Sequence, residues 1–224
     1  MTLSLARRAT LLLVTTLMAT GVPSFAVDFG RLHTSLIQHF GNSADGGFRA
    51  CRKLLDDSAS LSSKEKLQRV NEFFNRRVLF TDDMQAWGQS DYWATPMETL
   101  GKGKGDCEDF TIAKYFTLLT LGIPDEQLRL IYVKARIGGP DSRLQQAHMV
   151  LAYYANPAAE PLVLDNLITD IRPASRRPDL TPVFSFNSEG IWQGANGETQ
   201  GGTGTDRLSR WADLLRRARA EGFD

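Results

Sequence analysis

The stretch that decides the fold is residues 105–124, GDCEDFTIAKYFTLLTLGIP. Asp106 is a good helix N-cap residue, and Asp109 lies three positions later, where its side chain can reach back to the cap. Apolar residues then fall on more than one face of the helix, which is typical of a helix buried in the centre of a domain. A glycine and a proline end the pattern. The stretch therefore predicts a central helix over residues 107–121, with Cys107 in its first turn.

Three strand-like segments follow this helix. Residues 128–137, 148–154 and 161–167 are rich in branched and aromatic side chains. The linker 155–160 has turn chemistry, so the last two segments are predicted to form a hairpin. Strands that follow a central helix and are joined by short loops favour an α+β fold with an antiparallel sheet.

The rest of the chain gives helices and irregular segments. Ser62 and Glu65 have the spacing of a capping box, and apolar residues at helical spacing follow them. A last helix is predicted to begin at Thr205 or Asp206, with an apolar side and a solvated basic face. Two weaker helices are predicted over residues 30–40 and 44–57, and irregular segments over residues 80–105 (with one helical turn at 96–100), 173–182 and the flexible, glycine-rich 194–204.

Composition excludes several classes of protein. The chain has 224 residues, of which 42% are hydrophobic, and its 26 basic residues balance 26 acidic ones. These values are ordinary for a globular protein, so disorder, collagen and coiled coil are excluded as overall descriptions. Because proteins that wrap nucleic acid usually carry a basic excess, the zero net charge predicts no nucleic-acid partner.

Residues 1–26 have the features of a secretory signal peptide. A basic start precedes an apolar run of about 13 residues, 9–21, and Ser24-Phe25-Ala26 has the small-x-small pattern of a cleavage site. An uncleaved membrane anchor is the alternative, but a spanning helix needs roughly 20 apolar residues. The sequence thus predicts an exported chain in which residues 27–224 form one domain without a membrane span.

The first turn of the central helix offers a nucleophile. A thiol at that position feels the positive end of the helix dipole, which lowers its pKa. The helix amides can also stabilise an oxyanion. A small buried cysteine without a chemical role is the alternative for Cys107, since that is the usual state of a free cysteine.

A histidine and an aspartate lie on the predicted hairpin. His148 is predicted to start a strand, where its ring can face a cleft, and Asp165 lies near the end of the partner strand. A turn centred on residues 156–157 pairs the two directly, and a two-residue shift makes them diagonal neighbours on the same face. The hypothesis is a triad of Cys107 as nucleophile, His148 as base and Asp165 as its orienting acid. A structural histidine and a turn carboxylate are the alternatives.

Three carboxylates surround the thiol. Asp106, Glu108 and Asp109 would raise the pKa of Cys107 unless their charge is neutralised. A Ca²⁺ ion bound by some of them would cancel that effect, because carboxylates are its normal ligands. Capping carboxylates without a metal are the alternative. Zinc held by Cys107, His148 and Asp165 is less favoured, because the ligands are few and lack the short spacing of zinc sites.

The blocks GDCEDFTIAKYFTLLTLGIP, QAHMVLAYY and PLVLDNL together resemble the bacterial transglutaminase-like cysteine proteinases. The resemblance covers roughly residues 28–185. It implies a papain/transglutaminase-like α+β fold, in which a central helix that carries Cys107 packs on an antiparallel sheet that carries His148 and Asp165. It also implies a Cys-His-Asp cysteine endopeptidase.

The same resemblance implies a biological setting. Such enzymes are periplasmic and cut a large surface adhesin near its N-terminus. This cleavage releases the adhesin and disperses the biofilm. The periplasmic domain of an inner-membrane cyclic-di-GMP receptor sequesters them. Their activity depends on calcium, with Asp106 and Glu108, which flank the cysteine, as the implied ligands. The local charge pattern, independently of the resemblance, adds Asp109 as a candidate ligand.

Three other interpretations stay open at this stage. An acyl transferase would use the same triad with an amine in place of water. A non-catalytic binding module would keep the fold alone. A structural protein would hold Cys51 and Cys107 in a disulfide, which export makes chemically feasible.

Overall fold

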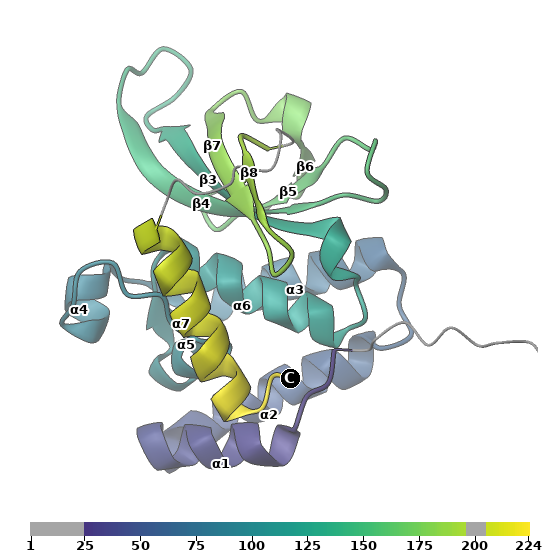
Figure 1. Ribbon diagram of the computed structural model, residues 1–224, viewed down its shortest axis with the longest axis vertical. Helices are drawn as coiled ribbons and strands as arrows, with labels where there is room; N and C mark the ends of the chain where they lie inside the picture. Colours follow the sequence, from purple (N-terminus) through teal and green to yellow (C-terminus); the bar gives the residue numbers. More distant parts are fainter. Residues whose placement is uncertain (1–24, 196–204) are drawn as a thin grey trace, which may run out of the picture.

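The computed structural model describes residues 25–195 and 205–224. In residues 205–208 it describes the backbone alone. The predicted signal peptide lies outside the described residues except for Phe25 and Ala26, and so does most of the predicted flexible segment 194–204. Helices form one layer and an antiparallel sheet forms the other (Figure 1). The predicted α+β class is confirmed.

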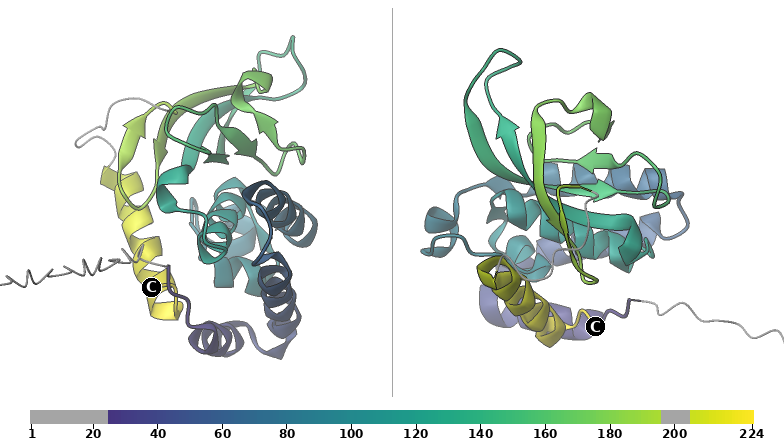
Figure 2. Two further views of the ribbon diagram at one scale, coloured as in Figure 1. Left: turned by 90° about the vertical axis from the view of Figure 1, so that its right-hand side faces the viewer. Right: turned by 45° about the horizontal axis from the view of Figure 1, so that its top comes forward.

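The helical layer surrounds one central helix. α6 (Cys107–Thr120) lies below the sheet, between α7 and the N-terminal helices (Figure 2). The predicted start at Cys107 is confirmed, and so is the Ser62–Glu65 capping box at the start of α3. The other helices are α1 (Phe29–Phe40), α2 (Asp45–Ser58), α3 (Ser63–Arg77), α4 (Asp83–Trp87), α5 (Pro96–Lys102) and α7 (Thr205–Glu221).

The larger sheet has six strands in the order β6-β5-β4-β3-β7-β8. The three predicted strands are present, and the predicted hairpin is β4–β5. A separate two-stranded parallel pair, β1–β2, lies next to the start of α6. The bounds are β1 (Leu79–Phe80), β2 (Lys104–Gly105), β3 (Leu128–Arg136), β4 (Gln145–Tyr153), β5 (Leu162–Leu164), β6 (Arg172–Pro173), β7 (Leu180–Phe186) and β8 (Ile191–Gln193).

Two segments differ from the predictions. Residues 173–182 were predicted to be irregular, but β7 already begins at Leu180 and pairs with β3. Pro182 is tolerated there because the β3–β7 register shifts beside it and β8 pairs only with Phe184–Phe186. Residues 80–105 contain α4 as well as the predicted turn at α5, because Asp82 caps α4 through the Gln85 amide.

The core forms around α6. Ile112, Ala113 and Leu118 are fully buried, so the predicted all-round burial of this helix is confirmed. On the helical side it meets Phe74 of α3, which is also fully buried, and on the other side it meets the inner face of β3 and β4. Burial on both sides holds the start of α6, and therefore Cys107, in a fixed place.

The C-terminal helix closes the molecule. Trp211 of α7 is buried and its ring contacts Tyr115 and Phe186. The prediction of a solvated basic face is wrong for Arg217, whose guanidinium bonds Glu98 at 2.6 Å and the Trp93 carbonyl at 2.6 Å. α7 thereby holds the loop that precedes α5. Among the described helices, none is long and apolar enough to cross a membrane.

Candidate active site

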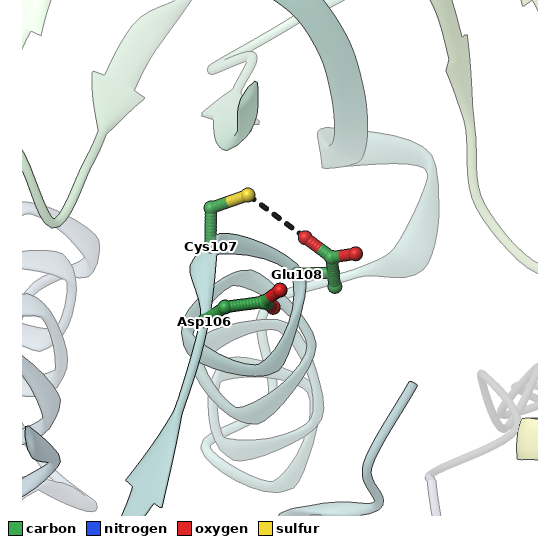
Figure 3. A group of neighbouring side chains, drawn as sticks. All are labelled: Asp106, Cys107 and Glu108. Carbon is green, nitrogen blue, oxygen red and sulfur yellow. Dashed lines mark hydrogen bonds between the residues drawn. The ribbon is translucent and has the colours of Figure 1, made fainter. Parts of the chain in front are cut away.

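Cys107 is the first residue of α6, and its thiol points toward the neighbouring carboxylate. Its Sγ donates a hydrogen bond to Glu108 Oε2 at 2.8 Å (Figure 3). The Thr111 hydroxyl lies 2.8 Å from the Cys107 carbonyl and 3.1 Å from the Met149 carbonyl. This hydroxyl therefore ties the start of α6 to β4, beside His148.

His148 is buried on β4. The prediction that it starts the strand is wrong: β4 begins three residues earlier, because its pairing with β3 extends to Gln145 opposite Arg136. The expectation that the His148 ring faces a cleft is nevertheless confirmed. Cys107 and His148 line one cavity of about 300 Å³, together with Trp93, Tyr132 and other residues.

Asp165 follows β5 directly and meets His148. The distance from His148 Nε2 to Asp165 Oδ1 is 2.8 Å, and both side chains are buried. The β4–β5 register places Leu151 opposite Leu164, which is a two-residue shift from direct pairing of His148 with Asp165. The two residues are therefore diagonal neighbours on one face, the second of the two registers considered from the sequence.

The charge on Asp165 fixes the histidine tautomer. Burial raises the pKa of the Asp165 carboxyl, but hydrogen bonds from His148, the Leu167 amide and Arg177 outweigh burial and hold that pKa at about 2. An ionised Asp165 accepts a hydrogen bond, so Nε2 of His148 carries the proton; the tautomer is assigned from this bonding pattern. Nδ1 is left to act as a base.

The Cys107 thiol is held in its protonated form. Burial raises its pKa well above the usual range, and the charges of Glu108 and Asp106 raise it further. The expectation that the helix dipole lowers this pKa is therefore wrong for the arrangement without a cation. Nearby carboxylates and loss of solvent outweigh the dipole, as expected when their charge is not neutralised.

The acidic cluster is larger than the sequence indicated. Asp106 and Glu108 lie beside Cys107 as expected, and carboxylate oxygens of Asp83, Asp106 and Asp109 lie within 4.8 Å of one another. Asp83, Asp91 and Glu108 form a second group at the same spacing. Sequence reasoning missed Asp83 and Asp91, because they come from a segment predicted as loop and have no fixed spacing from Cys107.

Asp109 has a bracing role within this cluster. Its side chain is fully buried and accepts hydrogen bonds from the Ala94 amide at 2.8 Å and from Trp87 Nε1 at 3.4 Å. It also accepts from the Asp106 amide at 3.4 Å, so the predicted reach back to the cap is present. Asp109 therefore joins the helix start to the loop before α5.

The donor set fits a hard cation. Asp83 Oδ1 and Asp106 Oδ1 are buried without a hydrogen-bond partner. Burial raises the pKa of Asp83 to about 6, and burial together with Glu108 and Asp109 raises the pKa of Asp106 well above its usual range. Crowded oxygen donors of this kind suit Ca²⁺. Zinc is disfavoured at Asp165, whose oxygens already accept from His148 and Arg177.

A glycine makes this packing possible, and its replacement is a test. A Cβ at Gly105 would lie 2.5 Å from Asp109 Oδ2. Gly105→Ala should therefore displace Asp109, destabilise the fold by about 1–3 kcal/mol and slow alkylation of Cys107. Urea unfolding and the rate of iodoacetamide labelling measure the two effects. Gly46→Ala is the matched control, since nothing lies within 4 Å of its Cβ position; equal behaviour of both variants would contradict this packing.

The two cysteines do not form a disulfide. Cys51 and Cys107 are both free thiols. Cys51 lines a small cavity with Thr117 and Thr120, near the far end of α6. Thr117 is ten residues from Cys107, or about 15 Å along a helix, whereas a disulfide needs Cα atoms within about 7 Å. The interpretation as a disulfide-linked structural protein is wrong.

A thiol at the start of a buried helix, facing a sheet that carries a His–Asp pair, defines a transglutaminase-like fold. The family model for bacterial transglutaminase-like cysteine proteinases matches residues 49–179. The chain belongs to this family of proteases. The matched range includes Cys107, His148 and Asp165.

Solved structures agree with this assignment. LapG from Legionella pneumophila is 38% identical, with a TM-score of 0.71, and the match covers 87% of this chain and 99% of that one. An EGTA-treated form of LapG gives 37% identity and a TM-score of 0.73 with the same coverage. A calcium-bound form gives 38% identity and a TM-score of 0.71, covering 85% of this chain and 99% of LapG. A comparison with curated proteins finds no match.

Proposed function

We propose that the protein is a calcium-dependent cysteine endopeptidase that works through Cys107, His148 and Asp165. The observation that carries the proposal is the shared cavity of Cys107 and His148, with Asp165 bonded to the far nitrogen of the ring. Membership of the proteinase family supports peptide bonds as the substrate class.

The residues supply each proton transfer of a thiol protease. Nδ1 of His148 takes the proton of Cys107, and the thiolate attacks the carbonyl carbon of the peptide bond. Amides of the first turn of α6 stabilise the oxyanion. His148 then protonates the leaving amine, which gives a thioester. Water attacks the thioester while Nδ1 takes its proton, and the acid product and the free thiol are released. Asp165 stabilises the imidazolium in both halves of the cycle.

Calcium fits the acidic cluster. The existence of calcium-bound and EGTA-treated forms of Legionella pneumophila LapG supports this ion. Asp106 and Glu108 are the proposed ligands beside the thiol, and Asp83 and Asp91 extend the set. When bound, the ion would supply positive charge that offsets the carboxylates which raise the pKa of Cys107. Glu108 would then no longer be held by the thiol.

The proposed setting is the periplasm, and the proposed substrate is the N-terminal region of a large surface adhesin. The signal-like residues 1–26 support export. A periplasmic domain of an inner-membrane cyclic-di-GMP receptor is the proposed regulator. Leu79, Phe80 and Met84 support a protein partner: they are 63%, 52% and 60% exposed, and Phe80 also lines the cavity of Cys107. A partner docked on these residues would cover the cavity.

The receptor proposal has its own test. A pull-down from inner membranes should recover a cyclic-di-GMP receptor with the parent protein, and recovery should fall for Phe80→Asp. Met84→Gln is a milder variant of the same exposed group. Recovery of unrelated proteins alone would contradict the proposal.

An acyl transferase is the alternative to a protease, because hydrolysis and acyl transfer pass through the same thioester. A thiol-directed probe such as iodoacetamide should label Cys107 rapidly in the parent with calcium and slowly in His148→Ala. Equal labelling of the two would contradict the role of the triad and would favour a non-catalytic binding module. Product masses separate water from an amine as the acceptor.

A further inference from the structure

An arginine outside the predicted triad is bonded to it. Arg177 lies between η3 (Ala174–Arg176) and β7 and is 2% exposed. Its Nη2 donates to Asp165 Oδ2 at 2.7 Å. The same guanidinium binds the Asp179 carboxylate, with Nε at 3.0 Å and Nη2 at 2.7 Å. The Asp179 carbonyl in turn accepts from the Arg136 amide at 2.8 Å, which attaches this loop to the end of β3.

The two oxygens of Asp165 have different partners. Oδ1 accepts from His148 at 2.8 Å and from the Leu167 amide at 3.0 Å. Within the described part of the chain, Arg177 is the one hydrogen-bond donor to Oδ2. A buried carboxylate stays ionised only when charge and hydrogen bonds compensate for lost solvent. Arg177 is therefore placed to keep Asp165 charged and to fix the plane of its carboxylate.

The other charges around Asp165 do not replace Arg177. His148 faces it from β4, and Lys114 of α6 is buried nearby and interacts with it electrostatically. Burial lowers the pKa of Lys114 to about 7, so its charge near neutral pH is partial. Asp179 adds an opposing negative charge behind Arg177. The guanidinium, with a raised pKa, is the permanent cation in this group.

We propose that Arg177 is a positioning residue of the active site, which holds Asp165 ionised and oriented toward His148. This inference rests on the proposed Cys-His-Asp chemistry and extends it to a fourth residue. Arg177 does not reach the substrate. It acts through Asp165, which without it would keep its two donors on Oδ1, lose the donor on Oδ2 and take up a proton at a higher pH.

Loss of the positive charge of Arg177 should change the pKa of Asp165. A neighbouring positive charge lowers the pKa of a carboxyl group by about 1–3 units, so removal of Arg177 should raise it by that amount. A protonated Asp165 no longer accepts the proton of His148 Nε2 as a charged partner. The ring then loses its fixed tautomer, and Cys107 loses its oriented base.

The test follows the His148 Nε2 proton by NMR while pH is lowered, in the full chain with calcium. Since the chain has three histidines and only His148 among them is buried, its hydrogen-bonded proton should give a distinct low-field resonance. In Arg177→Met this resonance should move or vanish at a pH about 1–3 units above that of the parent. Asp165 stays ionised at neutral pH in this variant, but its Oδ2 has lost the bond that orients the carboxylate. Iodoacetamide labelling of Cys107, followed by peptide mass spectrometry, should therefore slow about tenfold at neutral pH through the lost orientation alone.

Two further variants control the experiment. Arg177→Lys keeps a positive charge, so it should retain the resonance to nearly the pH of the parent while labelling slows less. Arg172→Met removes an exposed arginine that pairs with Asp170, and it should match the parent. Where circular dichroism shows that Arg177→Met does not fold, Arg177→Gln takes its place, because it is also neutral and keeps a donor.

The outcomes separate two failures. A folded neutral variant at Arg177 that keeps the resonance and labelling rate of the parent would overturn the positioning role. Equal labelling of the parent and His148→Ala would instead overturn the proposed triad, whatever Arg177 does. A loss of both readouts in Arg177→Met with rescue in Arg177→Lys is the expected result.

Discussion

Replacement of Cys107 by alanine should abolish peptide cleavage, with a loss of about 10⁴-fold or more. The residue supplies the attacking sulfur, and His148 and Asp165 have no nucleophile without it. Because the side chain is small and lies at a helix start, Cys107→Ala should keep the melting temperature of the parent within a few degrees. Cleavage followed by gel electrophoresis, with thermal unfolding on the same samples, measures both.

Three variants complete this experiment. His148→Ala should be nearly as inactive, and Asp165→Ala should keep some activity because the thiol and imidazole remain. Cys51→Ser is the matched control: Cys51 is buried near the far end of α6, so activity should persist. Burial raises the pKa of Cys51 to about 12, which keeps that thiol unreactive. Cleavage by Cys107→Ala at the rate of the parent would end the catalytic interpretation.

Removal of calcium should give the second large effect. A chelator should stop cleavage and lower the melting temperature, because an ion that binds only the folded state stabilises it. At about 100 times the dissociation constant that stabilisation is about 2.7 kcal/mol. For a domain of this size the melting temperature should fall by roughly 5–10 °C. Cys107→Ala should show the same shift, since calcium binding does not need the thiol.

Asp106→Asn separates charge from helix capping. Asparagine caps a helix as well as aspartate does, whereas Asp106→Ala also loses the cap at about 1 kcal/mol. Asp106→Asn should weaken calcium binding and cleavage together, and the exposed Asp170→Asn should leave both unchanged. If chelation and Asp106→Asn both leave stability and rate unchanged, the acidic cluster binds no calcium. A calcium-independent hydrolase would then remain.

Calcium affinity should also depend on pH. Without the ion, burial and mutual repulsion raise the pKa of Asp83 to about 6 and that of Asp106 well above its usual range. Protons therefore occupy part of the cluster near neutral pH, and calcium must displace them. Calorimetry should show proton release on binding and weaker binding as pH falls from 8 to 6. Affinity that is constant over this range would contradict calcium binding at these carboxylates.

The sequence predicts the centre of this fold because local signals agree there. Asp106, the apolar pattern after Cys107 and the closing glycine all indicate one buried helix, and the structure has it. The contact between His148 and Asp165 could be predicted because a hairpin restricts the strand register to a few choices. Among these, only shifts by an even number of residues keep both side chains on one face. The actual register is one of those choices.

Contacts between distant segments could not be predicted in this way. Asp83 and Asp91 reach the cluster only because the loop before α5 folds against α6 through the buried Asp109. Arg177 reaches Asp165 only because β7 returns alongside β3. Neither of these two long-range contacts produces a periodic pattern in the sequence. Pro182 is an unfavourable residue inside a strand, and it lies in the segment 173–182 that is predicted to be irregular, although β7 begins there at Leu180.

Mass spectrometry of the products from an adhesin N-terminal fragment decides whether this chain is a calcium-dependent cysteine endopeptidase. The fragment is incubated with the parent protein in calcium, with the parent in EGTA, and with Cys107→Ala in calcium. We expect two products in the first sample alone, with masses that sum to the substrate plus one water. Cleavage by Cys107→Ala, or products that carry an amine in place of water, would contradict it.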